Sequence, residues 1–246
     1  MIVDALMLLG ENRFGRSLSA ADAAAQADRL GVERIVAAPA RPADYHLGPA
    51  NDVLAGIAAD SRGRITALGR LDPTDGDRAV AEARRCLRDL GCAGLFLHPF
   101  EEAFRITEAR DLFAVAAELR APVVVATGFP MTSEPLQMAQ VAGQFPDVSI
   151  VMTNGGNINI SGLSLADAWL ALELAPNLLV MTNGEYRQDF IERLVGEMDA
   201  GRVMFGSMAP IFDPEYELLR VRSACMSDGA RSLLEGVAAA RVFGIE

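Results

Sequence analysis

The sequence predicts an α/β fold, a single (βα)8 TIM-like barrel with an extra C-terminal helix. Short apolar, β-branched runs alternate with longer segments rich in Ala, Leu, Arg and Glu, which is typical of parallel strands joined by helices. Eight such runs occur, and their starts lie about 25 to 32 residues apart, the length of one strand, one helix and two loops. Because barrels of this kind use about 250 residues as one domain, residues 1–246 are expected to form a single domain.

The expected strands and helices follow one another along the whole chain. Helix starts are indicated by Ser19, Thr107 and Ser133, which are residue types that cap helices. A final helix is expected from Asp228 to Phe243, packed outside the barrel. An open doubly wound sheet is the alternative, but no GxGxxG follows the first strand. The eight expected strands cover residues 2–8, 34–40, 65–71, 94–100, 122–128, 148–154, 177–183 and 202–208.

Composition excludes several classes of function. With 51% hydrophobic residues and a formal charge of −11, the chain can bury a large core and is a poor partner for nucleic acid or anionic membrane surfaces. All 22 basic residues are Arg, which excludes Schiff-base chemistry and a P-loop lysine. Three Cys without a metal or disulfide spacing favour a reducing compartment, so a cytoplasmic location is expected. No apolar run reaches the ~18 residues of a transmembrane helix.

Several segments together resemble a known family, and they occur in the right order over nearly the whole chain. The segments are VDALMLLG, GRLDP, GLFLHPF, PVVVATGFP, FPDVSIVMTNGG, APNLLVMTNG and RVMFGSMAP. They resemble the amidohydrolase-related family of the metal-dependent hydrolase superfamily. The resemblance implies a barrel with its site at the C-terminal ends of the strands, and a hydrolase, lactonase or decarboxylase of small carboxylated or aromatic compounds.

The positions that bind metal in that family carry other residues here. Leu6 and Leu8 replace the two His of the first strand, and Ala126 replaces the His before Thr-Gly. Asn154 stands where the family has His-x-Gly, and Met208 where it has the Asp of Gly-Ser-Asp-x-Pro. Because a catalytic Zn²⁺ or Mn²⁺ requires about three protein ligands, neither a metal nor another cofactor is expected. The same substitutions predict an apolar lining for a hydrophobic or aromatic ligand, or else a site refilled by packing residues.

Two residues are candidates for catalysis. His98, at the end of the fourth expected strand, is the natural general acid or base, with an unperturbed pKa near 6.5; a structural role is the alternative. Asp4 is the retained acid of the first-strand motif, and it alternatively only hydrogen-bonds the inside of the barrel.

Other polar residues are candidates for substrate binding. Arg70 is suited to a substrate carboxylate, or alternatively to an ion pair with Asp72. His46, in a loop, is expected to close over the mouth of the barrel or to be solvated. The densest polar set is suited to a polar head group, with Asn154 and Asn183 orienting the substrate; it comprises Asn154, Asn157, Asn159, Asn183, Glu185, Tyr186 and Arg187.

Two functions of different classes follow. The first is a metal-independent enzyme acting on a small carboxylated or aromatic compound. The second is a catalytically inactive homologue that acts as a ligand-binding protein or as the silent subunit of an active relative. For either, a small-molecule ligand is expected, as is a homo-oligomer or a hetero-oligomer with a related amidohydrolase.

Overall fold

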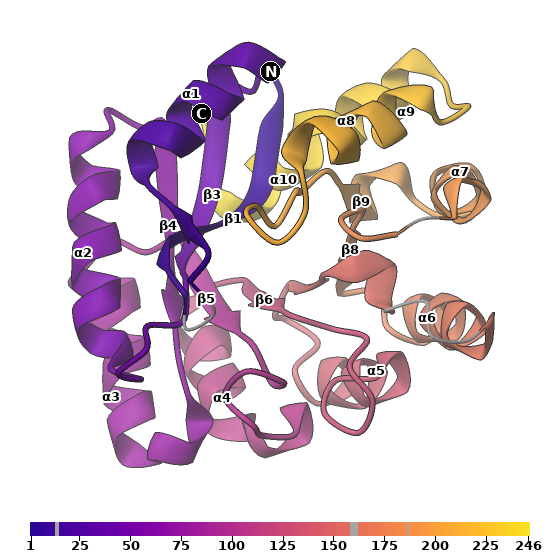
Figure 1. The fold of residues 1–246 in the computed structure, drawn as a ribbon. Coiled ribbons are helices and arrows are strands. Elements are labelled where there is room, and N and C mark those ends of the chain that lie inside the picture. The colour runs from indigo at the N-terminus through magenta and orange to yellow at the C-terminus, as the bar shows by residue number, and fades with distance from the viewer. Residues whose placement is uncertain (13–14, 158–161, 186) are drawn as a thin grey trace.

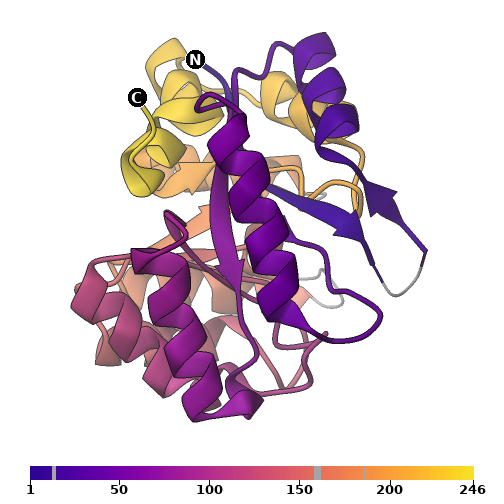
Figure 2. The same cartoon turned by 90° about the vertical axis from the view of Figure 1, so that its left-hand side faces the viewer.

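The computed structural model describes residues 1–12, 15–157, 162–185 and 187–246, which form a barrel of parallel strands (Figure 1). The parallel strands pair in chain order, and each of the eight predicted runs overlaps one of them; β1 extends beyond its run to Glu11. A short β2, Ser17–Leu18, pairs antiparallel with the end of β1 and was not predicted; this hairpin projects from the barrel in Figure 2. The parallel strands are β1 Val3–Glu11, β3 Arg34–Pro39, β4 Ile65–Arg70, β5 Gly94–Leu97, β6 Val123–Val125, β7 Ile150–Met152, β8 Leu178–Met181 and β9 Val203–Met204.

The two ends of the strand order meet, which closes the barrel. Met7 of β1 forms a parallel bridge with Ala209, just beyond β9. The Leu8 N–H donates to the Ala209 carbonyl, and the Met208 N–H donates to the Leu6 carbonyl, both at 2.7 Å. These bonds exclude the alternative of an open doubly wound sheet and fix the positions of residues 206–209 at the barrel mouth.

Helices surround the strands on the outside (Figures 1 and 2). The predicted cap Ser19 is confirmed, because its Oγ accepts from the Asp22 N–H at 3.0 Å. The other two cap predictions are wrong: Thr107 lies in a 3₁₀ turn, and the Ser133 hydroxyl donates to the Ala126 carbonyl. No helix in the described ranges is both long and apolar enough to cross a membrane. The outer helices are α1 Ala20–Leu30, α2 Leu47–Asp60, α3 Asp77–Arg88, α4 Arg110–Leu119, α5 Pro135–Gln144, α6 Gly162–Leu174, α7 Gln188–Glu197 and α8 Pro214–Ser223; short 3₁₀ turns are η1 Pro73–Asp75, η2 Ile106–Glu108, η3 Asn154–Gly156 and η4 Ala200–Arg202.

The predicted C-terminal helix is present, but it packs differently from the expectation. It consists of α9 Asp228–Ser232, a π-helical turn η5 Leu233–Val237 and α10 Ala238–Phe243. Its small and aromatic side chains join the apolar cluster of the barrel interior, which includes strand residues such as Leu6 and Phe96. The helix therefore covers the end of the barrel where β1 begins, instead of lying only on the outer surface.

Candidate functional site

A cavity of ≈ 340 Å³ lies at the mouth of the barrel, beyond the carboxyl ends of the strands from β5 to β9. The rings of Phe100 and Phe129 stack on its wall, with centroids 4.8 Å apart and planes within 10°. The His98 ring lies against Phe129 at 5.4 Å between centroids. A cavity of this size with mostly apolar walls and a few polar groups suits a small ring compound. It is lined by His98, Phe100, Glu101, Phe129, Asn154, Gly184, Met208, Ile211 and Phe212.

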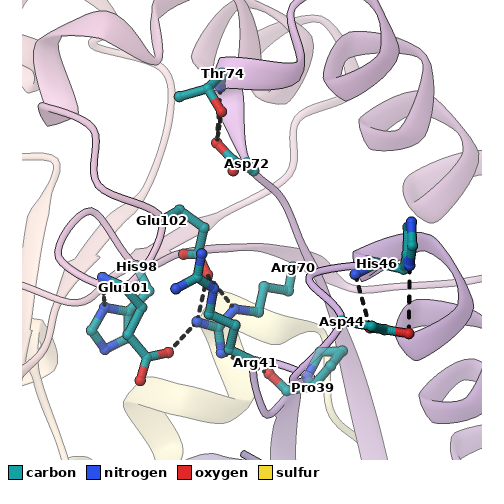
Figure 3. A network of polar contacts seen from close by, with 10 residues as sticks. All are labelled: Pro39, Arg41, Asp44, His46, Arg70, Asp72, Thr74, His98, Glu101 and Glu102. Atoms are coloured by element: carbon teal, nitrogen blue, oxygen red, sulfur yellow. Dashed lines mark hydrogen bonds and ion pairs between the residues drawn. The ribbon is translucent and has the colours of Figure 1, made fainter. Parts of the chain in front are cut away.

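His98 is a buried, neutral group in this cavity. Its side chain follows β5 directly, and the residue is only 5% exposed. Nδ1 accepts a hydrogen bond from the Glu101 N–H at 3.3 Å, so the proton of the neutral ring lies on Nε2 (Figure 3). Burial, together with the charge of Arg70, lowers the pKa of His98 to about 3. At neutral pH the His98 ring is therefore neutral and can donate a hydrogen bond through Nε2–H, and its expected role as general acid or base stays a prediction.

Arg70, at the end of β4, is fully buried in a network of ion pairs (Figure 3). Its NH1 donates to the Pro39 carbonyl at 3.0 Å, and Nε and NH2 donate to Oε1 of Glu102 at 3.2 and 2.8 Å. NH2 also pairs with Oε2 of Glu101, and Arg41 lies 3.4 Å from the same Glu102 oxygen. The chain's own carboxylates already occupy the guanidinium, as in the alternative of an internal ion pair, and the expected role of Arg70 as a substrate carboxylate anchor stays a prediction.

The expected pair of Arg70 with Asp72 is not formed. Asp72 instead accepts from the N–H and hydroxyl of Thr74 at 2.9 and 2.7 Å. The real partners, Glu101 and Glu102, were missed by sequence reasoning. The available signal was two consecutive acids directly after the HPF segment at a barrel strand end, where such residues face the mouth.

The two glutamates differ in charge state. Burial raises the pKa of Glu102 to about 7, even though Arg70 favours its charged form. Burial also acts to raise the pKa of Glu101, but the interactions with His98 and Arg70 outweigh it and lower that pKa. Glu101, which lines the cavity, is therefore a carboxylate at neutral pH.

Asn154 and Asn183 are paired, and they link neighbouring strand ends. The Asn183 Nδ2 donates to Oδ1 of Asn154 at 2.8 Å, and the Asn154 N–H donates to Oδ1 of Asn183 at 3.2 Å. The Asn154 Nδ2 donates to the Thr127 carbonyl at 2.9 Å. Asn154 lines the cavity. Asn183 does not line it, but its Nδ2 contacts the Sδ atom of the cavity residue Met208 at 3.5 Å.

The rest of the predicted polar set lies elsewhere. The Asn157 Nδ2 donates to Oε2 of the buried Glu185 at 3.1 Å, and the Glu185 Oε1 accepts from the Arg187 N–H at 2.7 Å. None of these three lines the cavity. Asn159 and Tyr186 lie outside the described residues.

Asp4 lies below the cavity, in the barrel interior. Its Oδ1 accepts from the N–H groups of Ser207 and Leu6 at 2.8 and 3.2 Å, which ties β1 to the segment after β9. Burial raises its pKa to about 6. Asp4 is not among the cavity-lining residues, and its hydrogen bonds are of the kind expected for the structural alternative; its catalytic role stays a prediction.

The apolar residues at the family's metal positions mostly pack in the core. Leu6, Leu8 and Ala126 belong to the interior cluster and are not among the residues that line the cavity, so their predicted substrate contacts gain no support from the structure. Met208 alone of the four apolar replacements reaches the cavity. His46 is also not at the cavity: its side chain is 75% exposed and lies 3.4 Å from Asp44 at a separate surface depression (Figure 3).

The side chains at the mouth do not fit a divalent-metal centre. Within the described ranges, no group of three His, Cys, Asp or Glu is placed to hold a metal ion. The cavity itself presents one imidazole and one carboxylate, and Nδ1 of that imidazole and Oε2 of that carboxylate are already engaged. A metal centre needs about three such ligands.

Comparison with known proteins identifies the family. The family model described as amidohydrolase matches residues 8–245, and the chain belongs to this family. No curated protein matches the sequence.

Solved structures show the same fold at low sequence identity. A 2,6-dihydroxybenzoate decarboxylase complexed with 2,6-dihydroxybenzoate has a TM-score of 0.79 and 17% identity, over 99% of this chain and 98% of that one. An uncharacterised TIM-barrel protein from Bordetella bronchiseptica has a TM-score of 0.80 and 17% identity, with the same coverage. A dihydroxybenzoic acid decarboxylase from Polaromonas, with bound manganese and 2-nitroresorcinol, has a TM-score of 0.74 and 14% identity, over 93% and 86%. At these identities the similarity establishes the barrel alone.

Proposed function

We propose that this member of the amidohydrolase family binds a small aromatic compound at the mouth of its barrel, without a divalent-metal centre. The observation that carries the proposal is the cavity walled by Phe100, Phe129 and Phe212 at the mouth of the barrel. The sequence resemblance implies that the family's metal positions lie at the same end, and three of them, Leu6, Leu8 and Ala126, are apolar residues of the interior cluster. The decarboxylases with the same fold act on small aromatic acids, and one of them holds manganese. The proposed function shares the aromatic class of ligand with these decarboxylases and differs from the manganese-containing one in that no metal takes part.

The walls and the polar groups of the cavity have separate parts in binding. A planar ring gains burial and offset stacking against Phe100 and Phe129, which adds about 0.5–1.5 kcal/mol beyond the buried area. The Nε2–H of His98, the amide of Asn154 and the carboxylate of Glu101 then fix the orientation of the polar edge of the ligand.

A metal-independent enzyme of the hydrolase, lactonase or decarboxylase type is the second candidate. It is favoured by one observation, the carboxylate of Glu101 beside His98 in the cavity. Ligand binding ranks first because the pKa values of both groups are lowered, whereas proton transfer is most efficient when the pKa lies near the working pH. Turnover of a bound aromatic compound by the metal-free protein, lost in Glu101→Gln, would reverse this ranking.

The test of the proposed function is the Phe100→Ala variant. Phe100 is 56% exposed, so its removal leaves the core intact while it removes one stacking ring. We expect a two- to tenfold weaker affinity for aromatic compounds, measured by titration calorimetry, from the loss of about 0.5–1.5 kcal/mol of stacking. Tyr216→Ala is the matched control, because Tyr216 is 59% exposed and does not line the cavity. Equal affinity in the two variants would place the ligand elsewhere.

A further inference from the structure

We infer that the aromatic compound bound in this cavity carries a hydrogen-bond donor and no negative charge: it is a neutral phenol or a cationic amine, not an aromatic carboxylate. The inference rests on the proposed function and deepens it by naming the ligand class. It is carried by the placement of charges around the cavity, where an acidic side chain faces the ligand and the basic side chains do not.

The only charged side chain that lines the cavity is Glu101, among the residues that the structure describes there. Its side chain is 10% exposed, as a group at the edge of a cavity is. The two nearby cations are held behind it: the Arg70 side chain is 0% exposed and that of Arg41 is 9% exposed, and neither lines the cavity. A ligand carboxylate would therefore meet a carboxylate first.

Glu101 also has one carboxylate oxygen, Oε1, that is available to accept a hydrogen bond from a ligand. Its Oε2 pairs with Arg70, whereas no hydrogen bond to Oε1 is formed within the described part of the chain (Figure 3). A carboxylate oxygen only accepts, so a ligand group that hydrogen-bonds to it must be an O–H or N–H. A charge-assisted bond of this kind is about twice as strong as a neutral one.

The cations behind Glu101 do not reverse this preference. Arg70 pairs with Glu101 and Glu102, and Arg41 pairs with Glu102, so side chains of the protein itself already face both cations. All three nitrogens of the Arg70 guanidinium already donate to protein acceptors. Because His98 lies close to Arg70 and is buried, it adds a neutral donor and not a positive charge. Among the described residues that line the cavity, none is a cation that would compensate the charge of a bound anion.

The experiment compares three ligands that share one ring system: 2-naphthol, 2-naphthylmethylamine and 2-naphthoate. Their affinities for the wild-type protein are measured by titration calorimetry in the presence of chelator. We expect 2-naphthol or the amine to bind at least tenfold more tightly than 2-naphthoate. If 2-naphthoate binds as tightly as the better of the other two, the inferred ligand class is wrong, while the proposed aromatic site stands. If none of the three binds, the proposed function itself fails, and the inference with it.

A variant tests whether Glu101 sets the selectivity. Glu101→Gln keeps the shape and removes the charge, and we expect at least tenfold weaker binding of the preferred ligand together with tighter binding of 2-naphthoate. Glu118→Gln is the matched control, because Glu118 pairs with Arg84 and Arg88 on the outer surface, and its selectivity should equal that of the wild type. Unchanged selectivity in a folded Glu101→Gln protein would overturn the inference. If the Glu101→Gln protein does not fold, the affinities of the wild-type protein for the three naphthyl compounds still test the inferred ligand class.

Discussion

Single residues in this barrel differ from their expected chemistry because burial, and not residue type, sets their charge state. His98 is 5% exposed and lies next to the positive charge of Arg70, so the neutral imidazole is favoured. Arg70 is surrounded by acceptors of the chain itself and acts as an internal brace. Sequence reasoning assigns His98 to catalysis and Arg70 to substrate binding by residue type, whereas burial among other charged groups decides what each side chain has free to offer a ligand.

The pKa of His98 can be tested directly. In the His46→Gln protein, His98 is the only histidine, and its ring proton resonances follow the charge of one group. We expect no protonation between pH 8 and 5 in the folded protein, whereas the urea-unfolded chain should titrate at about 6.5. A folded-state midpoint above pH 5.5 would contradict the neutral-donor assignment.

The same shift has a consequence for stability. Because the pKa of His98 is about 3 when folded and lies higher when unfolded, the unfolded chain binds the extra proton. The contribution of His98 to stability is therefore fully present above about pH 6.5 and is lost as the pH falls towards 3.

Arg70 should matter for stability far more than a surface arginine. Arg70→Met leaves Glu101 and Glu102 buried without their main partner, so we expect a loss of about 3–5 kcal/mol in the free energy of unfolding. Arg84→Met, which breaks a surface pair with Glu118, should cost less than about 1 kcal/mol. Urea unfolding measures both variants. Similar small losses would mean that the buried network does not stabilise the fold.

At the scale of elements, the C-terminal helical run shows how a small residue positions a helix against the barrel. Gly236, in the π-helical turn, lies so close to the start of β1 that an added Cβ would be 2.3 Å from the Met1 carbonyl oxygen. This approach lets Ala238, Ala239 and Phe243 reach the interior cluster. The range of this helix was predictable from its periodicity. Its position over the end of the barrel was not predictable, because that position depends on a close contact with a residue far away in sequence.

Gly236→Ala tests this close approach. The added methyl group must displace the backbone at Met1, so we expect a loss of about 1–3 kcal/mol in the free energy of unfolding. Gly229→Ala is the control within the same helical run, because nothing lies within 4 Å of its added Cβ; it should be neutral or slightly stabilising. Equal melting temperatures for the two variants would argue against the tight packing of this helix.

At the scale of the whole molecule, the sequence predicted the barrel because each strand and helix has its own local pattern. The same reading located the strand ends, and with them His98, Asn154 and Met208, which do line the cavity. It could not select among the other candidates, because Leu6 and Leu8 lie on the same strand, yet both pack in the interior cluster and neither lines the cavity.

The aromatic wall was also beyond sequence reasoning. Phe129, Ile211 and Phe212 come from loops after different strands, and only the closed barrel brings them together. The ion pairs of Arg70 with Glu101 and Glu102 likewise join residues that are 31 and 32 positions apart in the chain. Contacts of this kind depend on loop conformation, which has no periodic signal in the sequence.

The central claim is that this amidohydrolase-family barrel works as an aromatic site without a bound divalent metal. The most direct test is elemental analysis of protein purified without a His-tag, incubated with excess Mn²⁺ or Zn²⁺ and then freed of loose ions by gel filtration. The account predicts far less than one ion per chain, because the residues that the structure describes at the mouth offer too few ligands. One retained ion per chain would contradict it.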